Sequence, residues 1–171
     1  MAVDYSQKGG AGKTTLAIHL AVAAEGDGKQ SAIVDLDPQA SAANWGDSRK
    51  EETPVIVSAQ PSWLDKVLAA AKSAGAVLAI IDTAPYSESA SLAAARAADF
   101  IIVPCRPAVL DLHAISHSID SIKLAGRPAS VMLNTVPPGV AWLLMLPPLS
   151  PLMACLFVQS TLDKGQLFYM R

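Results

Sequence analysis

Runs of consecutive apolar residues, separated by longer alanine-rich segments, constrain the fold of this chain more than any other feature. A strand that is apolar at every position must be buried on both faces, as in a parallel sheet covered by helices on each side. Such runs predict strands at 31–35, 55–57, 76–82, 100–103 and 130–133. Periodicity and stop signals predict helices at 13–25, 41–49, 61–74, 89–98 and 110–125. The sequence therefore predicts an α/β fold with helices on both faces of a parallel sheet.

A glycine-rich loop precedes the first predicted helix. Its residues are Lys8, Gly9, Gly10, Ala11, Gly12, Lys13, Thr14 and Thr15. Three glycines allow the backbone to turn so tightly that successive N–H groups can point at phosphate oxygens. The helix that begins near Lys13 adds the positive end of its dipole. The loop is therefore predicted to bind phosphate, and a turn that binds nothing is the alternative.

The residues that follow the glycines have the types that a nucleotide with Mg²⁺ requires. Lys13 is expected to reach the β- and γ-phosphates, and the Thr14 hydroxyl to coordinate Mg²⁺. Thr15 is expected near the α-phosphate. The general P-loop pattern asks for glycine at the position of Gln7, so the segment departs from that pattern and carries a second lysine, Lys8, instead. These residues predict a site for ATP and Mg²⁺.

Three aspartates follow apolar runs and are candidates for the same site. Asp35 and Asp37 leave the end of one predicted strand, two residues apart, and so point the same way. Asp35 is expected to hold Mg²⁺ through water, and Asp37 to orient the attacking water. Asp82 ends another strand in the manner of a Walker B aspartate and is expected to bind Mg²⁺ indirectly. An acidic exit from a strand without chemistry remains the alternative in each case.

Residues 7–15 resemble the deviant Walker A loop of ParA/MinD-type partitioning ATPases, and residues 35–39 resemble their Asp-x-Asp-Pro-Gln segment. The resemblance implies a P-loop NTPase-like fold and slow ATP hydrolysis. It also implies an ATP-dependent homodimer in which Lys8 reaches the partner's phosphates. The family's usual role is plasmid or chromosome partition with a ParB-like, DNA-bound adaptor that stimulates hydrolysis.

The resemblance extends to less specific segments. Residues 83–87 would form a switch that senses the γ-phosphate. Residues 102–107, followed by 110–111, would lie near the dimer face, with an ordinary strand-to-helix loop as the alternative. Asn134, at the end of the strand predicted at 130–133, would approach the adenine as the family's base-binding segment does.

Both ends of the chain depart from the family pattern. Asp4 interrupts the apolar character expected of a buried first strand, which is therefore expected to be poorly formed. Residues 1–137 are interpreted as an incomplete P-loop ATPase domain. Residues 138–171 form an apolar tail that contains Pro147, Pro148 and Pro151. We expect this tail to be non-native, from a frameshift or truncation; a small folded extension and a membrane span are the alternatives.

Composition limits the partners. The net charge is −2 and no basic run is present, which argues against a strongly basic nucleic-acid surface, although non-specific DNA binding remains possible. Cys105 and Cys155 have no metal-ligand spacing and are compatible with a reducing, cytoplasmic location. His113 and His117 are interpreted as solvated or core-edge residues because no further ligands are near them in sequence.

Two other functions stay open beside a partitioning ATPase. One is a catalytically inactive, truncated remnant that still binds nucleotide. The other is a MinD-like membrane-associated ATPase, which needs a basic amphipathic C-terminal helix. Residues 163–171 are too short and too poor in charge for such a helix, so no membrane partner is expected.

Overall fold

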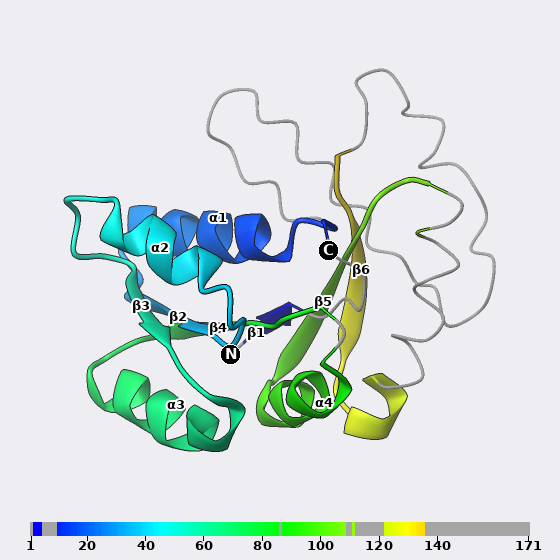
Figure 1. The fold of residues 1–171 in the computed structure, drawn as a ribbon. Helices are drawn as coiled ribbons and strands as arrows, with labels where there is room; N and C mark the ends of the chain where they lie inside the picture. Colours follow the sequence, from blue (N-terminus) through cyan, green and yellow to red (C-terminus); the bar gives the residue numbers. More distant parts are fainter. Residues whose placement is uncertain (1, 5–9, 86, 109–110, 112–121, 136–171) are drawn as a thin grey trace.

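The computed structural model describes residues 2–4, 10–85, 87–108, 111 and 122–135. Its centre is a six-stranded sheet in the order β3-β2-β4-β1-β5-β6, in which every neighbouring pair is parallel (Figure 1). The strands are β1 (Ala2–Asp4), β2 (Ser31–Asp35), β3 (Val55–Ser58), β4 (Leu78–Asp82), β5 (Phe100–Cys105) and β6 (Ala129–Leu133). The α/β fold with a parallel sheet is thereby confirmed.

Helices cover both faces of this sheet. They are α1 (Lys13–Gly26), α2 (Ser41–Asp47), the 3-10 helix η1 (Pro61–Trp63), α3 (Leu64–Ser73) and α4 (Glu88–Ala97), and residues 122–125 are also helical. Figure 1 shows α1 and α2 on one face of the sheet and α3 and α4 on the other. The two-layer covering explains why the central strands could be apolar at every position.

Alternation along the strands divides the core in two. Ile33 and Ile80 pack with alanines of α1 and α2, whereas their chain neighbours Val34 and Ile81 belong to the cluster on the opposite face. Successive side chains of a strand point to opposite faces, so each strand contributes to both clusters. Two hydrophobic layers, one on each face, thus stabilise the sheet. The carboxyl ends of its strands are available for a binding site.

Small side chains form the buried face of α1. Leu16 and Leu20 are only partly buried. The fully buried positions are Ala17 and Ala21, which pack against the sheet. A methyl side chain lets the helix axis approach the strands closely, and the larger leucines then lie at the margin of the contact.

The first strand is short but formed, so the expectation that Asp4 would disrupt it is wrong for the described residues. Val3 pairs in register with Ile81 of β4 and with Ile101 of β5, which places β1 in the middle of the sheet. Asp4 is the last residue of the strand and does not interrupt it. The carboxyl end of β1 therefore lies at the centre of that edge of the sheet.

Proline does not end β5 where the sequence suggested. The strand was expected to stop before Pro104 but continues to Cys105. Ile101 donates to the Pro128 carbonyl and the Cys105 carbonyl accepts from Asn134, so odd-numbered residues of β5 bond toward β6. Pro104 faces the other side, where the register with β1 ends at Ile102. A missing N–H is tolerated there because no described strand residue needs it.

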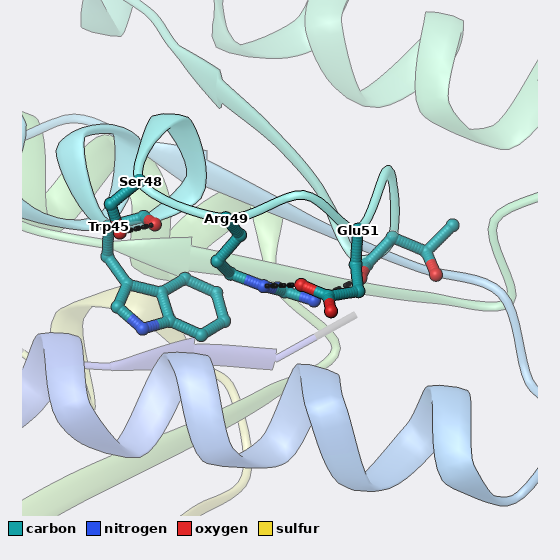
Figure 2. A network of polar contacts seen from close by, with 5 residues as sticks. Trp45, Ser48, Arg49 and Glu51 are labelled. Atoms are coloured by element: carbon teal, nitrogen blue, oxygen red, sulfur yellow. Dashed lines mark hydrogen bonds and ion pairs between the residues drawn. The ribbon is translucent and has the colours of Figure 1, made fainter.

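Helix α2 is held by contacts at its C-terminal end. Figure 2 shows Arg49 between the indole of Trp45 and the carboxylate of Glu51. The Arg49 guanidinium lies 4.2 Å from the indole centroid, its Nε is 3.5 Å from Glu51 Oε2, and its Nη2 donates to the Thr53 carbonyl at 2.6 Å. These contacts fasten the end of α2 to the connection that leads into β3.

The remaining predictions agree within a few residues or fall outside the described residues. The helix expected at 61–74 is present, with its first turn in the 3-10 form. The helix expected at 110–125 is described only at residues 111 and 122–125, and the tail 138–171 lies wholly outside. None of the helices in the described part of the chain has the length and hydropathy needed to cross a bilayer.

Candidate functional site

The candidate site lies at the carboxyl edge of the sheet, where β2 and β4 end and α1 begins. Asp35 and Asp82 are register partners on these adjacent strands. Lys13 is the first residue of α1 and is 94% buried, with a relative exposure of 6%. Because parallel strands all end at the same edge, aspartates distant in the sequence meet beside the start of α1.

Two glycines of the glycine-rich loop, Gly10 and Gly12, have the tight-turn backbone conformation that the sequence predicts. Gly10 and Gly12 have φ angles of 75° and 90°, in the left-handed region that residues with a Cβ rarely adopt. Gly12 is also the N-cap of α1 and provides no side chain to bond the first N–H groups of the helix. Those N–H groups and the helix dipole are therefore available to an anion at this end.

Asp82 is the most unusual carboxylate among the described residues. It is 1% exposed, and neither of its oxygens has a hydrogen-bond partner in the described part of the chain. Its pKa is raised to about 6, chiefly by burial and to a lesser extent by the nearby charges of Asp35 and Asp37. The Thr14 hydroxyl and the Lys13 ammonium act in the opposite direction and lower this pKa. Four other predicted site residues are thus within electrostatic reach of Asp82.

A buried carboxylate without a donor is costly unless something else satisfies it. The fit of Asp82 to Mg²⁺ follows from its surroundings, because carboxylate and hydroxyl oxygens are the hard ligands that this ion prefers. Mg²⁺ at nucleotide sites takes most of its ligands from phosphate and water. It is therefore consistent that the described residues contain no group of three or more His, Cys, Asp or Glu side chains able to hold a metal.

Asp35 is buried like Asp82 but is fully engaged with the backbone. Its Oδ1 accepts the Asp37 N–H at 3.0 Å, and its Oδ2 accepts the N–H groups of Ala42 and Ala43 at 3.0 and 3.1 Å. The latter two belong to the first turn of α2, so the carboxylate anchors that helix end. The structure gives Asp35 a structural role, and its part in holding Mg²⁺ through water stays a prediction.

Asp37 lies at the rim of the site and is half-buried. One of its oxygens accepts the Gln39 N–H at 2.9 Å, which fixes the side chain, and the Asp35 carboxylate fixes its backbone. The second oxygen has no partner in the part of the chain that the structure describes. That geometry leaves one oxygen of Asp37 for an external group such as water.

Asn134, which the resemblance suggests as a base-binding residue, has a side chain held by two hydrogen bonds. Its side-chain Nδ2 donates to the carbonyl of Ala11 at 3.1 Å, across 123 residues of sequence. Its Oδ1 accepts the Thr135 N–H at 2.9 Å. Asn134 therefore contacts the glycine-rich loop itself, and an approach to adenine stays a prediction.

Arg106 belongs to the segment 102–107 that the resemblance placed near the dimer face, and its contact with the glycine-rich loop was not predicted. A Cβ placed on Gly10 would lie 3.4 Å from its Nη2, so the guanidinium lies directly against the loop. Its side chain is exposed, and no carboxylate among the described residues pairs with it. A further signal for a role at the loop was its position just beyond the end of β5, at the edge where Asp35 and Asp82 also lie.

Some predicted residues cannot be placed. Lys8 and Gly9 lie outside the described residues, as does Tyr86 in the proposed switch segment 83–87, and so do His113 and His117.

Two further predicted residues are described. Thr15 is exposed on the first turn of α1. The buried Thr83 follows Asp82 directly and has interactions of its own.

Comparisons with known proteins agree with this geometry. The family described as "CobQ/CobB/MinD/ParA nucleotide binding domain" matches residues 5–142. The maintenance of carboxysome distribution protein A of Gloeobacter kilaueensis is 34% identical over 134 residues, which are 77% of this chain and 61% of that protein. The chain thus spans under two thirds of the length of this relative.

Solved structures share the fold at low sequence identity. MinD cell division protein from Aquifex aeolicus has a TM-score of 0.67 at 18% identity, over 84% of this chain and 71% of that one. Cobyrinic acid a,c-diamide synthase from Mycobacterium smegmatis, with bound ATP analog and magnesium, has a TM-score of 0.65 at 19% identity, over 84% and 79%. With the family match covering most of the sequence, the chain belongs to the CobQ/CobB/MinD/ParA nucleotide-binding family.

Proposed function

We propose that this chain binds ATP with Mg²⁺ and hydrolyses it slowly, as part of an ATP-dependent homodimer that positions a cellular cargo. The observation that carries the proposal is the juxtaposition of Asp82, buried and without a hydrogen-bond donor, with Lys13 and Thr14 at the start of α1. A carboxylate, a cation and a hydroxyl around an open helix N-terminus suit a metal-bound polyphosphate better than any other ligand class.

Each residue then has a defined task. The backbone N–H groups of residues 10–13 and the Lys13 ammonium bind the phosphate chain. Thr14 and Asp82 would hold Mg²⁺, which when bound neutralises phosphate charge and orients the phosphoryl group. Asp37, fixed by Gln39 and Asp35, orients water with its second oxygen. Because α2 is anchored by Asp35 at one end and by Arg49 at the other, the segment that carries Asp37 is held in place.

The proposed cargo depends on the relatives. A plasmid or chromosome, with a ParB-like adaptor, is the role that the resemblance implies. The relative at 34% identity is named for carboxysome distribution, which favours a carboxysome as the cargo. Both roles use the same nucleotide cycle, so the site geometry supports the cycle and leaves the cargo to experiment. We retain a cytoplasmic location as part of this proposal.

Hydrolysis and association test the proposal together. Phosphate release and sedimentation velocity should be measured with ATP and Mg²⁺ for the parent chain and for Asp37→Asn. We expect slow phosphate release from the parent and an ATP-dependent dimer. Asp37→Asn should still dimerise but release phosphate at least tenfold more slowly, because it can bind water but accept its proton only poorly. A parent chain that binds ATP without any phosphate release or dimer would instead be the inactive nucleotide-binding remnant.

A further inference from the structure

We propose that Asn134 is a positioning residue for the phosphate-binding loop, which it locks in its ligand-ready backbone conformation. The inference rests on the proposed function, because it concerns how the same loop is held for polyphosphate. It assigns to Asn134 a task at the phosphates, whereas the family resemblance pointed to the base.

Hydrogen bonds fix the Asn134 side chain at both of its polar atoms. Nδ2 donates to the Ala11 carbonyl at 3.1 Å, and Oδ1 accepts the Thr135 N–H at 2.9 Å. Turning the amide over would set oxygen against the Ala11 carbonyl and nitrogen against the Thr135 N–H, and both contacts would be repulsive. The backbone N–H of Asn134 is itself fixed by the Cys105 carbonyl at 2.6 Å. The amide is therefore held rigidly at the end of β6.

The same amide occupies the space beside Gly12. A Cβ built on Gly12 would collide with Asn134 Nδ2, and the φ angle of Gly12 is 90°. Gly12 is thus required for two independent reasons, the left-handed backbone and the close approach of the amide. This packing shows that the loop and Asn134 are fitted to each other.

The hydrogen bond to Ala11 also sets the direction of a donor. The Ala11 carbonyl and the Gly12 N–H belong to one planar trans peptide unit, so they point in opposite directions. When Asn134 holds the carbonyl toward β6, the Gly12 N–H must point away from β6. A donor fixed in this way binds an anion without losing further backbone freedom, which is the benefit of preorganisation.

Inorganic tripolyphosphate separates the two possible roles of Asn134. A residue that reads adenine contributes to the binding of ATP and nothing to the binding of tripolyphosphate, which has no base. A residue that positions the loop contributes to both. The experiment is isothermal titration calorimetry of the full chain with ATP and with tripolyphosphate, each with Mg²⁺, for the parent and for Asn134→Ala.

We expect Asn134→Ala to bind both ligands about tenfold more weakly, because one hydrogen bond that preorganises the site is lost. Gln60→Ala, at an exposed position before η1, is the control and should bind both ligands as the parent does. Each variant is first shown to be folded by its ligand-free thermal transition. A purely structural role of Asn134 would lower that transition and leave the affinity of the folded protein unchanged.

If Asn134→Ala does not fold, Asn134→Ser tests the same point, because a serine hydroxyl is too short to reach the Ala11 carbonyl from this backbone. Weaker binding of ATP with unchanged binding of tripolyphosphate would overturn the inference in favour of base reading. Unchanged binding of both ligands would overturn it as well. A parent chain that binds neither ligand would refute the proposed function itself, which is a distinct outcome.

Discussion

Asp35 and Asp82 lie side by side on β2 and β4, yet their carboxylates have opposite environments. Asp35 accepts three backbone N–H groups, whereas Asp82 accepts none from the described residues. Both are almost completely buried. The contrast indicates that Asp35 stabilises the fold, whereas Asp82 is available to bind a ligand.

Asp82→Asn should stabilise the protein when nucleotide and metal are absent. The pKa of the Asp82 carboxyl in the parent chain is raised from 3.8 to about 6, so the folded state binds this proton more tightly than the unfolded state does. The stability that this proton provides is present below about pH 4 and is lost as pH rises through 6. Asn resembles the protonated carboxyl, so denaturant unfolding at pH 7.5 with chelator should show a gain of ~3 kcal/mol at most.

The pH dependence gives the sharper check of Asp82. The difference in unfolding free energy between Asp82→Asn and the parent should shrink as pH falls from 7 to 4. The variant should also lose the stabilisation that MgATP gives the parent. An equal gain at every pH, or a variant less stable than the parent at pH 7.5, would contradict this account of Asp82.

Asp35→Asn should destabilise the protein in the same assay. The substitution replaces one accepting oxygen by an NH₂ group that faces backbone donors, so at least one buried hydrogen bond is lost. The expected cost is about 1–3 kcal/mol in unfolding free energy. Asp37→Asn is the matched control, because Asp37 lies at the rim of the site. The unfolding free energy of this variant should differ from that of the parent by less than about 0.5 kcal/mol. Equal stability of the two variants would show that Asp35 does not anchor α2.

Gly12→Ala should abolish nucleotide binding and destabilise the loop. The new Cβ would meet the Asn134 amide, and the φ angle of 90° is strained for alanine. Gly26→Ala is the control, because the last residue of α1 has nothing within 4 Å of a Cβ. Equilibrium binding of a fluorescent ATP analogue should fail for Gly12→Ala and match the parent for Gly26→Ala. Normal binding by Gly12→Ala would exclude the loop as the phosphate site.

Arg106→Gln should weaken ATP binding by about fivefold to tenfold at low salt, because the guanidinium lies against Gly10 without a carboxylate partner in the described chain. The affinity of the variant should also depend less on salt than that of the parent. Arg96→Gln makes the same change of charge in the last turn of α4, at the opposite edge of the sheet. If both variants show the same loss, the effect is one of net charge and not of position.

The order of strands and helices could be predicted because each element carries its own local signal. The apolar runs that end in Asp35 and Asp82 predicted two buried strands, and the glycines before Lys13 predicted the loop and the start of α1; that the two strands are adjacent came from the structure. The buried stripe of α1 could not be predicted, because α1 is apolar around most of its circumference. Only packing against Ile33 and Ile80 selects Ala17 and Ala21 for the interior.

The contacts that segments distant in the sequence make within the site could not be predicted from the sequence. The sequence identified Asn134 as a candidate but could not show that its amide bonds Ala11, because that contact depends on the position of β6 in the sheet. The contact of Arg106 with Gly10 depends on β5 in the same way. Likewise, the different surroundings of Asp35 and Asp82 are set by where α2 begins.

Binding of ATP by the glycine-rich loop is the central claim, and Lys13→Ala tests it most directly. Isothermal titration calorimetry with ATP and Mg²⁺ should give saturable one-site binding for the folded parent chain. Binding by Lys13→Ala should be at least a hundredfold weaker, because this buried cation faces the phosphates. Equal affinity of the two proteins, or a folded parent that binds neither ATP nor ADP, would contradict the account.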